Sequence, residues 1–345
     1  MNKNRKLINL QLFSENINTT GSVGLSVENK TYYDMVLLRE AKPNLVHDQF
    51  AQKRNIPKRG GKTIEFRKFG SLPKALTPLT EGVTPDGSLM EATAITATVN
   101  QYGDYIKITD TVNLTQIDPV LNEAVKMSGD QAGRTLDTIT RDAMAAGSNV
   151  IYAGGKLSRA NLTDSDKLTV QLVKKAATQL KRHNTPKING SYVGIIHPDV
   201  AYDLTEDERF EKWHVYAKPD ELYEGEIGRI FGVRFVESTE AKIWRDNTCP
   251  VLQAGTPAAG TTPAVPTTYK AVFSTVILGA NAYATTEVEG GGLETIIKPF
   301  GAGDDPLNQR ATEGWKATKT SKILNNSFMV RIESLSEYSS MEDAN

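Results

Sequence analysis

The chain has 345 residues, of which 39% are hydrophobic and 23% charged, so it is long enough for two or more domains with cores of their own. Forty lysines and arginines oppose 41 acidic residues, and the net charge of −1 excludes a global field that would draw the protein onto nucleic acid or an anionic membrane. The single cysteine, Cys249, excludes an internal disulfide and a cysteine metal cluster, and no run approaches the roughly 18 apolar residues of a membrane span.

Residues 1–62 are expected to form an N-terminal arm with short helices. Residues 1–30 are polar and cannot bury much alone, so this part is predicted to be flexible or bound to a partner. Asparagines interrupt its basic, mildly apolar start and no small-residue cleavage site follows, which argues against a signal peptide. Residues 31–39 (TYYDMVLLR) show a short helical pattern.

Residues 63–110 are predicted to contain two strands around a projecting hairpin. The segment TIEFRKF at 63–69 favours a strand, and apolar residues alternate with polar ones again around 95–99 and 105–108. Between them, residues 70–91 are rich in proline and glycine and have no face that could be buried. Because a compact domain rarely carries more than about 15 structureless residues without a functional reason, we interpret this stretch as an arm that touches something outside its own subunit.

Residues 118–147 (DPVLNEAVKMSGDQAGRTLDTITRDAMAAG) predict one helix of roughly 40 Å. Asp118 can cap it, Pro119 suits its first position and Gly147 is placed to supply a left-handed residue just past its end. Gly129 and Gly133 each cost about 1 kcal/mol relative to alanine, so they indicate either a bend or the close approach of another backbone. A narrow stripe of apolar or small residues, typical of a helix lying on a thin sheet, is formed by Leu121, Val125, Ser128, Ala132, Leu136, Ile139 and Ala143.

The following segment predicts a compact α/β unit within residues 168–269. An amphipathic helix at about 169–182 precedes an Asn189–Gly190 turn, a buried strand at 191–197 and a helix that opens at Pro198. Residues 229–232 then form a tight turn into a strand at 233–237, and the Pro/Ala/Thr-rich stretch 247–268 is a surface insertion.

Residues 270–345 bring further strands, at 270–279, 283–288 and 293–298, and finally one long strand or two over 316–332, where Asn325–Asn326 is the possible break. These strands have no helices of their own. We therefore expect them to complete the sheet that the long helix covers.

The sequence contains few candidate catalytic motifs. Gly60–Gly61–Lys62–Thr63 lacks the earlier glycine and the following helix of a phosphate-binding loop, so it indicates a solvated turn. Gly290–Gly291–Gly292 precedes a strand and indicates a flexible turn. His197 and Asp199 form a possible acid–base pair, but no nucleophile elbow accompanies them, and a histidine that caps a helix or turn is the favoured interpretation.

One basic run is a candidate contact surface. It comprises Lys53, Arg54, Lys58, Arg59, Lys62, Arg67 and Lys68. It could meet DNA phosphates or acidic residues of a neighbouring subunit, and we favour the neighbour because the run leads into the projecting arm. The residues predicted to make inter-subunit contacts, at the root of the arm and along it, are Arg54, Lys58, Arg59, Arg67, Lys68, Lys74, Glu81 and Asp86.

The order of these elements resembles that of the major capsid proteins of tailed bacteriophages with the HK97-like fold. The resemblance runs from about residue 31 to 334, and the segments that carry it are NLVHDQFAQKRNIPKRGGKTIEFRKFGSLPKALTPLTEGVTPDG (44–87), TATVNQYGDYIKITD (96–110), GRTLD (133–137), GRIFGVRFVES (228–238), LGANAYATTEVEGGGLETIIK (278–298) and DPLNQRATEGWKA (305–317). It implies an α+β fold in which 63–110 is the extended loop, 111–167 a peripheral domain with a spine helix, 168–269 an axial domain, and 270–345 the return strands of the peripheral domain and a C-terminal tail.

The resemblance also implies a structural protein without a cofactor, which self-assembles into hexamers and pentamers of an icosahedral head. Such a head encloses double-stranded DNA without sequence specificity, has a portal protein at one vertex, and assembles in the host bacterial cytoplasm. Only about 60 residues precede the first strand, too few for a fused scaffold, so a separate scaffolding protein is expected. Some relatives crosslink a lysine of this loop to a neighbour's asparagine; Lys74 lies in the loop, but its partner cannot be identified from sequence.

Two rival hypotheses remain open. A cellular nanocompartment shell of the encapsulin type would share the fold but enclose a cargo enzyme instead of DNA. An enzyme with its active site near His197 and Asp199 would belong to a different class altogether.

Overall fold

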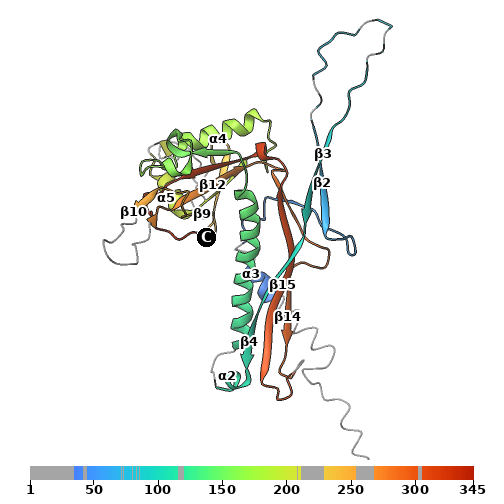
Figure 1. Cartoon of the computed structure of the whole chain (residues 1–345), viewed down its shortest axis with the longest axis vertical. Coiled ribbons are helices and arrows are strands. Elements are labelled where there is room, and N and C mark those ends of the chain that lie inside the picture. The colour runs from blue at the N-terminus through green and yellow to red at the C-terminus, as the bar shows by residue number, and fades with distance from the viewer. Residues whose placement is uncertain are drawn as a thin grey trace, which may run out of the picture.

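The computed structural model describes residues 35–345 apart from 42–44, 71, 73, 80, 83, 85, 116–119, 208, 211–228, 254–267 and 302–304. The structure has three parts: a compact α/β unit, a long helix on a sheet, and an arm that projects away from both (Figure 1). The α-helical segment 35–41 lies beside the long helix. The Pro119 and Asp118 cap predicted for that helix is outside the described residues.

The long helix, α3 (Val120–Ala145), lies along a five-stranded sheet. This sheet has the order β1–β13–β15–β14, with β4 on the other side of β15. Its strands are β1 (Gln52–Lys53), β4 (Asn100–Thr109), β13 (Tyr283–Thr286), β14 (Glu294–Lys298) and β15 (Arg310–Ile323), and the short helix α2 (Asp110–Thr115) follows β4. Val125, Ala132 and Leu136 of α3 pack against Trp315 and Ala317 of β15, which confirms the helix-on-sheet prediction.

The two glycine predictions for this helix had different outcomes. A Cβ at Gly129 would lie 2.9 Å from the backbone oxygen of Leu37, so the backbone of the 35–41 segment does approach the helix closely there. The left-handed role predicted for Gly147 is wrong, because Gly147 is not among the residues with positive φ. A Cβ at Gly147 would lie 3.0 Å from Met329 Cε, so packing space explains the glycine better than backbone conformation does.

The compact unit is built on a seven-stranded sheet of order β5–β16–β12–β6–β8–β7, to which β9 adds beside β12. Its strands are β5 (Val150–Tyr152), β6 (Tyr192–Ile196), β7 (Arg229–Ile230), β8 (Val233–Glu237), β9 (Ile243–Trp244), β12 (Val272–Leu278) and β16 (Met329–Ser334). Helices α4 (Val170–Arg182) and α5 (Pro198–Thr205) share one core with this sheet. Short strands β10 (Val251–Gln253) and β11 (Thr268–Tyr269) pair at the base of the predicted insertion.

The amphipathic helix and the two turns predicted for the compact unit are present. α4 starts one residue later than predicted, because Thr169 caps the helix by accepting a hydrogen bond from the backbone N–H of Leu172. Asn189 and Gly190 both have positive φ, 48° and 80°, as a tight hairpin turn between residues 188 and 191 requires. Phe231 and Gly232 repeat this pattern between β7 and β8, with φ of 50° and 84°.

The expectation that all strands after residue 270 complete the sheet under the long helix is wrong for two of them. β12 and β16 pair with each other inside the compact sheet, next to β6 and β5 respectively. Every residue of both strands is buried, which requires cover on both faces of the sheet. The α4 and α5 core covers one face, and a cluster around Met144 and Tyr283 covers the other. Chain direction changes between β15 and β16 at the 3-10 turn Asn326–Phe328, so the last strand is two strands.

A buried polar pair joins α3 to the segment that enters the arm. The imidazole Nδ1 of His47 lies 2.6 Å from Asp137 Oδ2, and the His47 backbone N–H donates to Asp137 Oδ1 at 2.8 Å. Both side chains are 2% exposed or less. The Tyr283 hydroxyl donates to the carbonyl oxygen of His47 and ties the same segment to β13.

Candidate assembly interface

The arm begins as a two-stranded hairpin of β2 (Thr63–Phe69) and β3 (Ala92–Thr98), as predicted. The strands pair from Thr63 opposite Thr98 to Phe69 opposite Ala92, and the Gly70 N–H donates to Glu91 O at 3.1 Å as the last pairing contact. β3 continues almost directly into β4, which belongs to the five-stranded sheet. One chain segment thus leads from the body of the subunit into the arm (Figure 1).

A small apolar cluster fixes the root of the arm to the body. Phe66 of β2 and Ala97 of β3 are buried against Ala284 of β13, and Leu324 at the end of β15 packs on them. The rest of β2 and β3 is mostly exposed. The hairpin therefore has one anchored end and a free remainder.

Beyond the last strand pair, the described part of the arm exposes large apolar side chains. Leu76 is 82% exposed, Leu79 77% and Leu89 90%. Phe69 at the end of β2, Leu72 just after it and Met90 just before β3 are also more than half exposed. Scattered exposed leucines are ordinary, but a run of them on one projecting element marks an interaction surface.

Three of the predicted cations gather at the root of the arm. The Arg54 guanidinium lies 5.8 Å from the centroid of the Phe66 ring, and Arg67 Nε donates to Glu65 Oε1 at 3.1 Å. Together with Lys68 they line a groove of about 310 Å³, completed by Gln52, Phe66, Phe69, Ile95, Asn281, Leu324, Asn325 and Phe328. We call this the root groove. Apolar walls and a basic rim suit a segment that carries both leucines and carboxylates.

The other predicted contact residues lie elsewhere. Lys58 and Arg59 belong to the turn before β2, where Arg59 has a φ of 68° and the Lys58 side chain lies over Gly290. Lys74, Glu81 and Asp86 are exposed on the loop of the arm. The eight predicted contact residues therefore lie in three places: three in the root groove, two in the turn before β2 and three on the loop of the arm.

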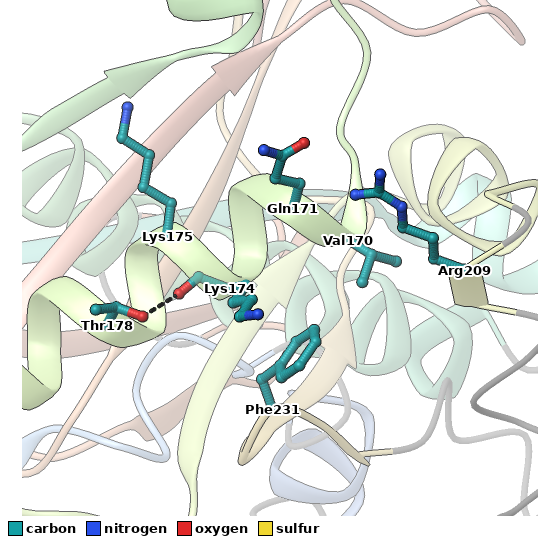
Figure 2. Close-up of a pocket in the computed structure, with 7 residues that line it drawn as sticks. All are labelled: Val170, Gln171, Lys174, Lys175, Thr178, Arg209 and Phe231. Atoms are coloured by element: carbon teal, nitrogen blue, oxygen red, sulfur yellow. Dashed lines mark hydrogen bonds between the residues drawn. The ribbon is translucent and has the colours of Figure 1, made fainter.

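A second basic hollow, which sequence reasoning missed, lies on α4 of the compact unit (Figure 2). Its volume is about 640 Å³, and its lining residues are Val170, Gln171, Lys174, Lys175, Thr178, Arg209 and Phe231. Lys174 Nζ lies 5.3 Å from the centroid of the Phe231 ring, and the Thr178 hydroxyl donates to the Lys174 carbonyl oxygen. The signal was available, because residues 170–182 contain no acidic side chain.

His197 serves as a helix cap. Its Nδ1 accepts a hydrogen bond from the backbone N–H of Asp199 at 3.3 Å at the start of α5, and the centroid of its ring lies 5.1 Å from that of Phe273, with the two rings tilted by 40°. Burial lowers the pKa of His197, against the opposing effect of the Asp199 carboxylate. These contacts confirm the capping interpretation. Burial likewise raises the pKa of the Cys249 thiol, which gives an inert side chain rather than a nucleophile.

Within the described ranges, no three His, Cys, Asp or Glu side chains are grouped so that they could hold a metal ion. No helix in the same part of the chain combines the length and the apolarity needed to span a membrane.

Residues 92–317, well over half of the chain, match the family of phage capsid proteins. The chain belongs to this family. Solved capsids have the same fold as this phage capsid protein: the capsid of Ralstonia phage GP4 (TM-score 0.61, 12% identity, 86% of this chain and 88% of that chain), the capsid of the cyanophage P-SCSP1u (0.59, 16%, 84% and 87%) and the capsid of cyanophage Pam1 (0.57, 14%, 88% and 93%). No curated protein matches the sequence.

The phage capsid protein therefore has the HK97-like fold, and it is a structural component of a virion rather than an enzyme. Its assembly surfaces, not a catalytic pocket, are the functional sites to explain. Among the described residues, the arm and its root groove have the strongest combination of exposure, apolar side chains and charge.

Proposed function

We propose that this phage capsid protein assembles into the hexamers and pentamers of an icosahedral head that encloses double-stranded DNA. The observation that supports this most strongly is the arm, whose leucines at 76, 79 and 89 find no cover in their own subunit among the described residues. Covering them requires another molecule, and in a shell made of one chain that molecule is a neighbouring copy. Head-to-tail contacts of this kind generate closed rings when the rotation between copies closes.

Ring formation from such an arm is physically reasonable. Each contact is modest, but a subunit held in a ring makes several at once, and their combined strength greatly exceeds that of one contact. A net charge of −1 limits repulsion among hundreds of copies. The same near-neutral balance agrees with DNA that is held inside without sequence-specific contacts.

The expected partners follow from the proposed shell. A separate scaffolding protein would guide curvature, a portal protein would occupy one vertex, and assembly would take place in the host bacterial cytoplasm. The predicted contacts of Arg54, Lys58, Arg59 and the other five residues belong to this proposal as well.

Electron microscopy of the full chain, produced in bacteria with and without a candidate scaffold, tests the proposal. We expect closed shells with sixfold and fivefold rings, and head particles from phage-infected cells should contain nuclease-protected double-stranded DNA. Shells that contain a protein cargo and no portal would instead favour a nanocompartment. A protein that stays monomeric under all these conditions would contradict the proposed function.

A further inference from the structure

Charge is divided unevenly along the arm. Residues 52–69, at its root, contain seven lysines and arginines and one acidic residue, Glu65. Residues 70–91 contain one cation, Lys74, and three acidic residues, Glu81, Asp86 and Glu91. The root is therefore basic and the loop acidic, although the chain as a whole is close to neutral.

The two ends also complement each other in apolar surface. The root groove is walled by Phe66, Ile95, Leu324 and other apolar side chains that stand beside its cations. The loop offers exposed Leu76, Leu79, Leu89 and Met90 beside its carboxylates. The apolar walls of the root groove would cover such leucines, while Arg67 and Lys68 at the rim of the groove would pair with the acidic side chains.

The loop of one subunit is directed away from its own groove. The residues after Phe69 lead away from the body (Figure 1), and eleven residues on each side of the loop extend up to about 36 Å beyond the last strand pair. A contact between loop and groove therefore joins two copies. Since it uses two different surfaces of one chain, it is a head-to-tail contact that repeats around a ring.

We propose that the acidic, leucine-bearing loop of one subunit's arm docks in the root groove of the next copy. This inference rests on the proposed self-assembly, and it identifies the two surfaces that meet. Glu81 and Asp86 face Arg67 and Lys68 in this arrangement, and the loop leucines pack on the apolar side chains that line the groove.

Charge reversal tests the pairing directly. The root variant Arg67→Glu/Lys68→Glu and the loop variant Glu81→Lys/Asp86→Lys should each lower the yield of closed shells roughly tenfold or more, because attraction becomes repulsion at every repeat of the contact. All four side chains are exposed, and Arg67 loses only its surface ion pair with Glu65, so a thermal melt should show each variant folded. The fourfold variant, in which the charges are exchanged, should recover most of the yield.

The exposed pair Lys174 and Lys175 on α4 supplies the matched control. Lys174→Glu/Lys175→Glu changes the charge by the same amount, but combined with the loop variant it should give no recovery. Normal shells from either arm variant alone, or no recovery in the fourfold variant, would overturn the docking proposal. The latter result would point to another occupant of the groove, such as an acidic segment of a scaffold. If even the unaltered protein forms no shells, self-assembly itself fails, which is a distinguishable outcome.

Disulfide trapping is an independent test of the contact between the loop and the root groove. The only native cysteine, Cys249, is buried, so engineered cysteines react against a low background. Assembled Lys68→Cys/Asp86→Cys protein should yield, after oxidation, a ladder of linked subunits on a denaturing gel, whereas Lys175→Cys/Asp86→Cys should not. Bands confined to the monomer position in the first variant would contradict the docking.

Discussion

Removal of the arm loop separates what the arm does for the subunit from what it does for the shell. Residues 70–91, 22 in number, would be replaced by Asn-Gly between Phe69 and Ala92, which already lie opposite each other. The deleted side chains are exposed where they are described, so no core contact is lost. Shortening a loop from 22 residues to two lowers the entropy cost of closing it by (3/2)RT ln 11, about 2 kcal/mol in favour of the folded state.

We therefore expect the deletion variant to unfold in urea at a concentration equal to or slightly above that of the full chain, and to form no closed shells. Denaturation measures the first quantity, and sedimentation velocity with electron microscopy measures the second. Closed shells at the normal yield would refute the role assigned to the arm. Loss of the folded state would refute the claim that the arm is independent of the subunit core.

Three further predictions concern the body of the subunit, and urea unfolding measures each of them. Asp137→Ala should lower the free energy of unfolding by about 1–3 kcal/mol, because it leaves the backbone N–H and the imidazole of His47 buried without their hydrogen-bond partner. Glu123→Ala, in an exposed ion pair on the same helix, should lower it by less than about 1 kcal/mol, and equal effects would contradict the reasoning. Gly129→Leu should lower the free energy of unfolding by about 1–3 kcal/mol, because the new side chain meets the backbone of Leu37. An unchanged urea midpoint would show that the 35–41 helix can move aside freely. Burial raises the pKa of Glu313, so the folded state binds a proton more tightly than the unfolded chain, and the protein loses stability as the pH rises through and above the ordinary glutamate pKa of about 4.5. Glu313→Gln should remove that loss and be the more stable form at pH 7, and a variant that is less stable at pH 7 but not at pH 4 would reverse the sign and refute it.

Elements with strong local signals could be predicted from the sequence. The amphipathic pattern of α4, the Asn189–Gly190 turn and the two strands of the arm all depend on residues close together in the chain. Period and turn chemistry determine such elements without knowledge of the rest of the molecule.

The assignment of strands to sheets could not be predicted in the same way. β12 and β16 have the propensity of strands, but neither propensity nor order along the chain states which sheet they join. The segment VFSTVIL of β12, which has no charged residue and is apolar apart from Ser274 and Thr275, was a usable signal, because a strand buried on both faces suits a covered central sheet. Gly147 illustrates the same limit: its neighbour Met329 comes from a strand 182 positions later in the chain.

The lining of the root groove could be predicted only in part. The cations at 54, 67 and 68 stand out in the sequence, and the structure places them on one groove. Leu324 and Phe328, which wall that groove, lie more than 200 residues further along the chain, so the groove emerges only on folding. The basic hollow on α4 was overlooked because its cations are interspersed with core residues of an amphipathic helix.

In the proposed shell, each subunit binds neighbouring copies of itself through its arm. A cryo-electron microscopy reconstruction of the closed particle, at a resolution that shows side chains, tests it most directly. We expect residues 70–91 of every subunit to lie on a neighbouring copy, with the leucines at 76, 79 and 89 covered. Arms that fold back on their own subunit, or that extend into solvent in a closed shell, would contradict it.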